Sequence, residues 1–300
     1  MASWGLVATV KASKDKVLAF AAHHLAMGAS HLALYFDDPL MPLPSVLARH
    51  PKVTVQRCDD AYWTEGDKTR PAEHQARQTR NARHATRRAT TDWLVHIDVD
   101  EFLHTPRPLA EILDEADADR LALKFEPFEA MHDPMLPDDI FTAREFRGAL
   151  RHEFWPRRRA VLGDYRKVIR DGMLSHTVGK VIFRTTGKKL QPKIHTVLWK
   201  KTHIPTPDWH PELKLLHFHA QDRQAWLDAL PFRLTRGAYQ FRPELQAFLT
   251  GATPAEIDAF YLRTQVMPVD LARVLQGVGR LVIVDLHLRQ KVQALRDGQL

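Results

Sequence analysis

The segment that decides the fold is WLVHIDVDEFL at residues 93–103, in which an apolar run leads directly into three acidic residues. Residues 93–97 are short, apolar and rich in side chains that favour β-structure, which predicts a central strand covered on both faces. In open α/β sheets, ligands bind outside the carboxyl ends of such strands. The sequence therefore predicts that Asp98 and Asp100 lie at a ligand site.

The same acidic residues predict a metal site. In an extended chain alternate side chains share a face, so we expect Asp98 and Asp100 to point the same way and Glu101 to point elsewhere. Two carboxylates that converge without a nearby lysine repel each other, and a divalent cation is the usual remedy. Oxygen ligands favour Mg²⁺ or Mn²⁺ over zinc. The structural alternative for these residues is a turn followed by a helix N-terminus.

Length and composition limit the class of protein. The chain has 300 residues, 44% of them hydrophobic, which suits one large α/β domain or a domain with an extension. A single cysteine, Cys58, excludes an internal disulfide and favours a reducing compartment. The sequence has neither a signal-peptide pattern nor an apolar run long enough to span a membrane, so we expect a cytoplasmic protein.

The charge balance favours an anionic partner. The chain carries 43 Lys and Arg against 36 Asp and Glu, a net charge of +7. Such an excess suits a nucleotide, a phosphorylated lipid or an anionic surface, and leaves open a peripheral association with the inner face of a membrane. The basic residues lack the interleaved aromatic residues of a known nucleic-acid-binding module, so no nucleic-acid partner is expected.

Strands and helices alternate along the first hundred residues. This alternation predicts right-handed crossovers and a mostly parallel, Rossmann-like α/β sheet flanked by helices. Asp37 and Asp38 follow the second strand and are expected at the same sheet edge as Asp98. The predicted strands are residues 6–10, 31–36, 53–57 and 93–97, and the predicted helices are 14–27, ended by Gly28, and 72–89.

Beyond residue 104 the pattern is looser. We expect a catalytic domain at residues 1–240 and a C-terminal helical extension at 241–300. The arginine-rich residues 144–170 suit an anionic acceptor. The apolar patch at 281–284 suits the core, a partner surface or a membrane contact. Further strands are predicted at 120–125, 180–184, 196–200 and 213–219, and helices at 109–115, from 224 onward and within 255–300.

Four blocks resemble the glycosyltransferase family 2 superfamily, of GT-A fold, and most closely its family 2-like and family 92-like members. The resemblance covers residues 5–240. The blocks are AHHLAMGA at 22–29 with the strand ending YFDD at 35–38, QARQTRNA at 75–82, the DVDEFL segment, and LHFH at 216–219.

The resemblance implies a metal-bound diphosphate. Asp98 and Asp100 form the Asp-x-Asp element that holds Mn²⁺ or Mg²⁺ against the diphosphate of a nucleotide-sugar. His217 or His219 is implied as a later ligand of the metal or the diphosphate. The cation would neutralise the leaving diphosphate as the sugar departs.

The resemblance also implies contacts to the rest of the donor. Asp37 or Asp38 matches the position that contacts the nucleoside. Arg80 and Asn81 match the Arg-Asn pair of the helix before the metal strand, where the arginine reaches a phosphate. Lys180 lies in a block of similar form and is expected to bind phosphate.

The resemblance implies an inverting hexosyltransferase of polysaccharide biosynthesis, which moves a sugar from a UDP-linked donor to a glycan or other hydroxyl acceptor. Inverting transfer needs a carboxylate base. The candidates are Glu129 and Asp133, with Asp164 as a further option.

Two departures leave other classes open. Residues 11–13 read Lys-Ala-Ser where many family members have Lys-Asn-Glu, and residues 126–130 lack the Phe-Gly pair that relatives tend to have. A metal-dependent nucleotidyltransferase or phosphoesterase would use the same carboxylates. A non-catalytic nucleotide-sugar-binding protein is the third interpretation.

Overall fold

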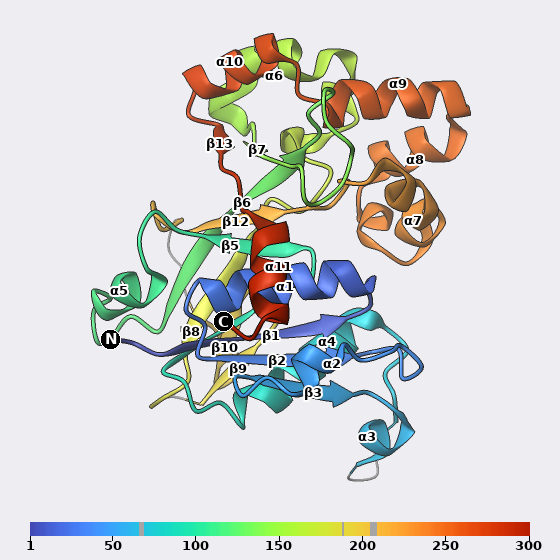
Figure 1. Ribbon diagram of the computed structural model, residues 1–300. Helices are drawn as coiled ribbons and strands as arrows, with labels where there is room; N and C mark the ends of the chain where they lie inside the picture. The colour runs from blue at the N-terminus through green and yellow to red at the C-terminus, as the bar shows by residue number, and fades with distance from the viewer. Residues whose placement is uncertain (66–68, 188, 205–208) are drawn as a thin grey trace. The chain divides into compact units, whose positions relative to one another are not determined.

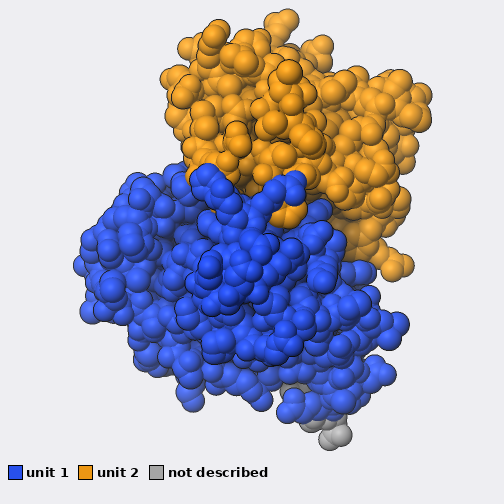
Figure 2. Space-filling model, in the orientation of Figure 1, with its two compact units in different colours: residues 1–126, 179–215, 287–300 blue, residues 127–178, 216–286 orange. Residues whose placement is uncertain are grey.

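The computed structural model describes residues 1–65, 69–187, 189–204 and 209–300 (Figure 1). The chain forms two compact units, coloured separately in Figure 2. Unit 1 comprises residues 1–126, 179–215 and 287–300, and unit 2 comprises residues 127–178 and 216–286. The functional boundary expected at residue 240 stays a prediction.

Unit 1 is an α/β sheet with the strand order β6-β8-β4-β1-β2-β3. The neighbours of β1 and β2 are parallel, whereas β8 runs antiparallel to both β4 and β6. The expected mostly parallel, helix-flanked α/β class is confirmed. The strands of this sheet are β1 (Trp4–Val10), β2 (His31–Phe36), β3 (Val53–Arg57), β4 (Trp93–His96), β8 (Lys180–Arg184) and β6 (Ala122–Met131), of which β6 continues into unit 2.

The remaining elements of unit 1 flank this sheet or extend it. The small antiparallel sheet β9 (Leu190–Pro192), β10 (Val197–Trp199) and β11 (Thr202–His203) follows β8. The others are α1 (Lys14–Ala26), α2 (Ser45–Ala48), α3 (Asp60–Thr64), α4 (His74–Thr86), β5 (Glu101–His104), α5 (Leu109–Asp114), α11 (Leu288–Arg296) and β12 (Lys214–His217), which continues into unit 2.

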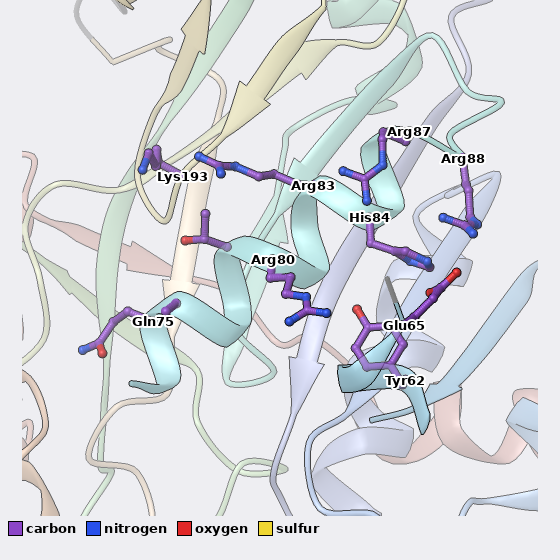
Figure 3. Close-up of a pocket in the computed structure, with 11 residues that line it drawn as sticks. Tyr62, Glu65, Gln75, Arg80, Arg83, His84, Arg87, Arg88 and Lys193 are labelled. Carbon is purple, nitrogen blue, oxygen red and sulfur yellow. The ribbon is translucent and has the colours of Figure 1, made fainter. Parts of the chain in front are cut away.

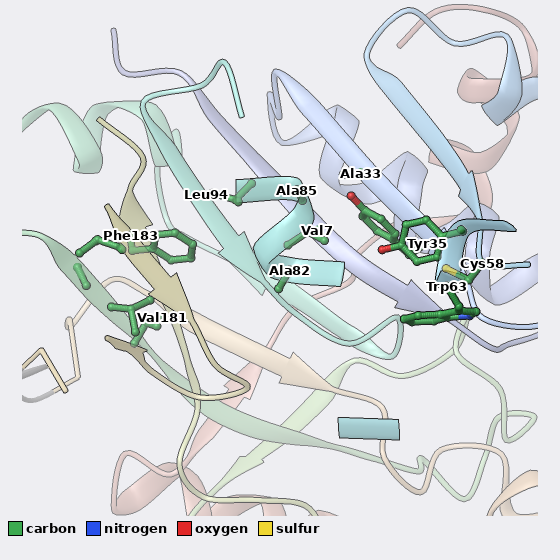
Figure 4. Close-up of a cluster of buried hydrophobic side chains, with 14 residues drawn as sticks. Val7, Ala33, Tyr35, Cys58, Trp63, Ala82, Ala85, Leu94, Val181 and Phe183 are labelled. Carbon is green, nitrogen blue, oxygen red and sulfur yellow. The ribbon is translucent and has the colours of Figure 1, made fainter. Parts of the chain in front are cut away.

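Apolar side chains explain why β4 is central. Trp93, Leu94 and Val95 are almost completely buried, as expected for a strand covered on both faces. Leu94 belongs to a cluster with Val7 and Phe183 from the neighbouring strands and with α4, seen in Figure 4. Burial of this cluster fixes α4 against the sheet face.

Two adjacent buried histidines anchor β5 to α1. His23 Nε2 lies 2.7 Å from the Leu103 carbonyl, and the Leu103 amide donates to His24 Nε2 at 3.2 Å. Lys291 of α11 reaches His23 Nδ1 at 3.2 Å, which ties the C-terminal helix to α1. The histidines of the AHHLAMGA block therefore hold the strand that follows the acidic turn.

Unit 2 contains the end of β6, a strand pair and most of the C-terminal helices. Apolar clusters form around Trp226 and Phe260 and around Leu162 and Leu271. The elements are β7 (Glu145–Gly148), η1 (His152–Phe154), α6 (Trp155–Leu162), η2 (Gly163–Lys167), η3 (Arg170–Gly172), α7 (Arg223–Thr235), η4 (Ala238–Phe241), α8 (Pro243–Gly251), α9 (Pro254–Gln265), α10 (Val269–Gly277) and β13 (Leu281–Ile283).

The apolar patch at residues 281–284 forms a strand where helices were expected. β13 pairs antiparallel with β7, and Ile283 is exposed. Its β-branched residues favour an extended chain over a helix. Among the described residues, no helix has both the length and the apolar character needed to cross a bilayer.

Candidate functional site

The strand order of unit 1 reverses beside β1. The chain proceeds from β1 to β2 to β3 on one side, and β4 then pairs with β1 on the other side. Ligands in open α/β sheets bind outside the carboxyl ends of the strands at such a reversal. Asp98 lies two residues beyond the end of β4, and Asp37 directly follows β2. The expectation that both acidic segments lie at one sheet edge is consistent with this topology.

The acidic segment is a turn, so the alternation expected for Asp98 and Asp100 was wrong. β4 ends at His96, and Val99 and Asp100 form a turn closed by the Glu101 amide, which donates to the Asp98 carbonyl at 3.0 Å. Glu101, expected to point away, instead accepts from the Asp98 amide through Oε2 at 2.7 Å. The carboxylates of Asp98 and Glu101 therefore lie close together, and Asp100 is half-buried in the turn.

A lysine lies between these carboxylates, contrary to the assumption of the sequence argument. Lys180 Nζ is 2.7 Å from Asp98 Oδ2 and 3.2 Å from Glu101 Oε2. Burial opposes the charge on Lys180, but the carboxylates of Asp98 and Glu101 outweigh it and raise the pKa of the ammonium. Lys180 and Glu101 are fully buried, whereas the Asp98 side chain is 26% exposed. Asp98 is thus the member of this cluster that a ligand can reach.

Helix α4 supplies two further side chains to this edge. Gln78 donates a short hydrogen bond to Asp98 Oδ1. His74, in the first turn of the helix, is affected by two sheet-edge carboxylates, because the charges of Asp98 and Asp37 both raise its pKa, although burial has the larger effect and lowers it. Both acidic segments therefore lie within electrostatic range of His74.

His96 packs beneath the acidic turn. Its Nδ1 lies 3.2 Å from the Lys193 carbonyl. Burial first, and then the charge of Lys180, lower its pKa to about 4. His96 is accordingly neutral near pH 7 and adds no charge to the site.

Asp37 is held by arginines. Arg77 Nε lies 2.9 and 3.0 Å from its two carboxylate oxygens, and Arg70 Nη2 lies 3.2 Å from Oδ1. Asp38, by contrast, is exposed, and its Oδ1 accepts from the Leu40 amide in a local turn. Asp37 therefore orients cationic groups at the sheet edge, and a ligand phosphate can meet these groups.

Asn81 and Arg80 hold neighbouring elements in place. Asn81 is fully buried, donating to Thr9 Oγ1 at 2.9 Å and accepting from the Tyr62 hydroxyl at 2.7 Å. Arg80 donates to the carbonyls of Thr69 and Trp63. These contacts connect α4 to β1 and α3, so they do not favour the predicted donor contacts for either residue.

Of the proposed bases, Glu129 is fully committed within unit 2. It is completely buried, forms an ion pair with Arg147 at 3.2 Å, and accepts from the amides of Leu174 and Ser175. Asp133 is half-buried, and its Oδ1 accepts from the Met135 amide at 2.8 Å. Asp164 is almost completely exposed and pairs with Arg166. Asp133 therefore has the more suitable environment for a base.

The predicted histidines lie in a polar cluster of unit 2. His217 and His219 have ring centroids 5.3 Å apart, and His176 approaches His217 at 5.1 Å. His219 Nε2 lies 2.8 Å from the Tyr239 hydroxyl. Burial, followed by the charge of Arg233, holds the pKa of His219 well below its usual value, so its ring is a neutral donor–acceptor.

The donor set at the sheet edge fits a divalent cation by its chemistry. Asp98 and Asp100 supply carboxylate oxygens of the kind that bind Mg²⁺ or Mn²⁺. Lys180 and Gln78 each donate to one oxygen of Asp98. A carboxylate oxygen can accept a further ligand, but the positive charge of Lys180 opposes the approach of a second cation. The residues therefore fit a cation that binds together with an anionic ligand, because the negative charge of that ligand would offset the positive charge of Lys180.

Several residues at this edge were not found from the sequence. Glu101 was visible as the acidic residue after Asp100, but its direction depends on the turn. His74, Gln78 and His96 carry no spacing signal of their own, because each acts through tertiary contacts. In the histidine cluster of unit 2, His176 was also not found, because it lies in an irregular segment with no periodicity that would single it out.

Comparisons with known proteins leave the family unassigned. No protein-family profile matches the sequence, and no curated protein is recognisably similar to it. Similar solved structures include a mycobacterial protein, with 12% identity over 61% of this chain and 54% of that chain and a TM-score of 0.33. HddC from Yersinia pseudotuberculosis has 8% identity over 62% of this chain and 77% of its own, with a TM-score of 0.31. S. aureus TarS 1–349 has 12% identity over 99% of this chain and 92% of its own, with a TM-score of 0.32. TM-scores this low carry no argument about activity, so membership of the family 2 glycosyltransferases stays a prediction.

Proposed function

We propose that the protein is a glycosyltransferase that moves a sugar from a UDP-linked donor to a hydroxyl group of a glycan, with inversion, and that residues 1–240 carry this activity. The observation that carries the proposal is the position of Asp98, which is partly exposed beyond β4 where the strand order reverses. The resemblance of the acidic segment to the Asp-x-Asp element adds the donor class.

The proposed donor site uses the charged residues of the sheet edge. Asp98 and Asp100 would hold Mn²⁺ or Mg²⁺, which would supply Lewis-acid stabilisation of the leaving diphosphate. Lys180 keeps a fixed positive charge beside Asp98 and is positioned to offset negative charge on the diphosphate. Asp37 orients Arg70 and Arg77 for the nucleotide portion.

Asp133 is the proposed base for the acceptor hydroxyl, because both oxygens of Glu129 are engaged by protein donors. His217 and His219 are proposed to assist at the diphosphate. Loss of general base catalysis typically lowers kcat by about 10²–10⁴-fold. An Asp133→Asn variant is therefore expected to lose turnover at this scale while nucleotide binding is unchanged.

Donor binding is tested by thermal unfolding with UDP and UDP-sugars, with and without Mn²⁺. Ligand at about 100 times its Kd adds about 2.7 kcal/mol to stability, a readily measured rise in Tm. The wild type is expected to respond with metal, Asp98→Asn and Asp100→Ala are expected not to, and the exposed control Asp119→Asn is expected to behave as wild type. Equal metal-dependent responses in all four proteins would contradict the donor site.

The reaction class is tested by product analysis. Sugar transfer, or slow hydrolysis of the donor, releases a nucleoside diphosphate. Release of pyrophosphate from a nucleoside triphosphate supplied with a sugar phosphate would indicate nucleotidyl transfer. Metal-dependent binding without any turnover would indicate a non-catalytic binding protein.

A further inference from the structure

A strongly cationic cavity lies beside the outer face of α4 in unit 1. Its volume is about 830 Å³, which falls within the range of about 300–1,000 Å³ typical of small-molecule sites. Figure 3 shows that its charged side chains come mainly from α4, with Lys193 contributed by the segment after β9. This cavity is not used by the site proposed above.

The arginines of this cavity share one stripe of the helix. Arg80, Arg83 and Arg87 are three, four and seven residues apart, which places them on the same face. Arg88 and Lys193 add two further positive charges, and Glu65 is the single carboxylate that lines the cavity among the described residues. Like charges at these spacings each cost a helix about 0.2–0.5 kcal/mol. A bound anion would remove this repulsion.

The cavity arginines differ from Arg77 of the same helix in their ion pairing among the described residues. Arg77 pairs with Asp37, whereas no ion pair of Arg83, Arg87 or Arg88 occurs within the described ranges. The Nε of Arg83 is buried and, among the described residues, has no hydrogen-bond partner. In Figure 3, Arg83 extends toward Lys193, and Arg87 lies beside His84. These donors are arranged around a concave space.

The pKa of His84 depends on the charges that line this cavity. Its Nδ1 lies 2.6 Å from the Tyr35 hydroxyl. Burial has the largest effect on the pKa of its ring and lowers it, and the charges of Arg88, Arg87 and Arg80 lower it further. The charge of Glu65 raises it. An anion beside these arginines would oppose their effect and favour proton uptake by His84.

We infer that this cavity binds a small ligand that carries at least two clustered phosphate groups. Guanidinium groups form paired hydrogen bonds with phosphate oxygens, and arginines one helical turn apart can each meet a different phosphate. A ligand with one carboxylate would leave most of the positive charge unneutralised. The described lining offers no exposed aromatic ring for base stacking, because Tyr62 is buried, so single-stranded nucleic acid suits it poorly.

This inference goes beyond the proposed transferase site and does not rest on it. Arg77 and Gln78 of α4 contact Asp37 and Asp98 at the sheet edge, whereas Arg83 and Arg87 line the cavity. Within the part of the chain that the structure describes, the cavity places no acidic pair beside the ligand. Binding there therefore needs no divalent cation, which separates the two sites experimentally.

The probe is inorganic tripolyphosphate, titrated calorimetrically into the full-length protein in EDTA at about 0.15 M salt, where the Debye length is about 8 Å. Each hydrogen bond to a charged group is worth about tenfold or more in affinity, so Arg83→Gln/Arg87→Gln is expected to weaken binding by about 100-fold. The matched control Arg289→Gln/Arg296→Gln removes two exposed arginines of α11 and is expected to bind as wild type.

Two further measurements make the test specific. The cavity variant is expected to keep the wild-type Tm or exceed it, because two repelling charges are gone, so lost binding does not reflect unfolding. Proton uptake, read from the dependence of the binding enthalpy on the buffer, is expected in the wild type and not in His84→Gln. Tighter binding of ATP than of tripolyphosphate would identify a soluble nucleotide, and tighter binding of a soluble phosphorylated inositol would identify a lipid head group.

Three outcomes overturn the inference. The first is equal tripolyphosphate affinity in the cavity and control variants. The second is loss of EDTA-insensitive binding in Asp98→Asn, which would place the phosphates at the sheet edge instead. The third is binding of anionic vesicles or an oligonucleotide without any binding of tripolyphosphate, which would indicate a polyanion surface.

Discussion

Glu101 in unit 1 and Glu129 in unit 2 are both fully buried carboxylates beside a buried cation. Glu129 uses both oxygens on Arg147 and two backbone amides, and its surroundings are closed. Glu101 shares Lys180 with Asp98, whose side chain is 26% exposed. The Glu129–Arg147 pair is therefore a structural ion pair, whereas a ligand can reach the Lys180 cluster through Asp98. Four predictions test this contrast, in order of decreasing effect.

The largest effect is expected for Glu129→Gln. The substitution leaves Arg147 buried without its counter-charge, which typically costs about 3–5 kcal/mol. The free energy of unfolding, measured in urea, is expected to fall by this amount. The control is Asp258→Asn, which breaks the exposed pair with Arg223 in the same unit and is expected to cost less than about 1 kcal/mol. Similar losses in the two variants would mean that burial does not set the cost.

Lys180→Met is expected to destabilise unit 1 by about 3 kcal/mol, because Asp98 and the buried Glu101 then face each other without a cation. Mn²⁺ is expected to restore part of this loss, since it can replace the missing charge, and should do nothing comparable for Glu129→Gln. Urea unfolding with and without Mn²⁺ measures both effects. Lys214→Met, which breaks a more exposed pair with Glu126, is the control. A failure of Mn²⁺ to stabilise Lys180→Met would argue against a metal at Asp98.

The His23–His24 pair predicts acid sensitivity in unit 1. Burial holds both pKa values below the usual 6.5, that of His24 at about 3, so the unfolded chain binds more protons than the folded one between about pH 3 and 6.5. The free energy of unfolding is therefore not reduced by these histidines above about pH 6.5. As the pH falls, it decreases by about 1 kcal/mol per histidine for each pH unit below 6. Urea unfolding at pH 7, 6 and 5 should show this slope, reduced in His24→Gln and unchanged in the exposed-residue variant His152→Gln. Identical slopes in all three proteins would refute it.

The smallest effect is expected for a substitution at the exposed start of helix α9 in unit 2. Thr253 and Glu256 form a reciprocal capping box at the start of α9. Thr253→Ala is expected to cost about 1 kcal/mol, the usual value of such a cap. Faster amide hydrogen exchange in the first turn of α9 would report the change, whereas a loss as large as that of Glu129→Gln would show that the cap supports the core.

The strands of the first hundred residues could be predicted closely because their signals are local. The expected strands at 31–36 and 53–57 match β2 and β3, and the expected helix ends at Gly28, whose φ of 90° suits glycine. The patch at 281–284 was placed among helices, since a short apolar run does not reveal its pairing partner. The partners of the acidic turn were missed for a related reason, because Lys180 lies 82 residues from Asp98 in the sequence.

By itself, the sequence determined the α/β class, the strand that precedes Asp98 and the acidic character of the sheet edge, because periodicity and residue type act over a few neighbouring positions. The tertiary structure alone decided that residues 99–100 turn, that Glu101 points inward and that Lys180 stands between two carboxylates. It also decided that the arginines of α4 divide between a paired face and a cationic cavity. Charges on distant segments become neighbours when the chain is packed, and their interactions depend on distance and burial that no local pattern encodes.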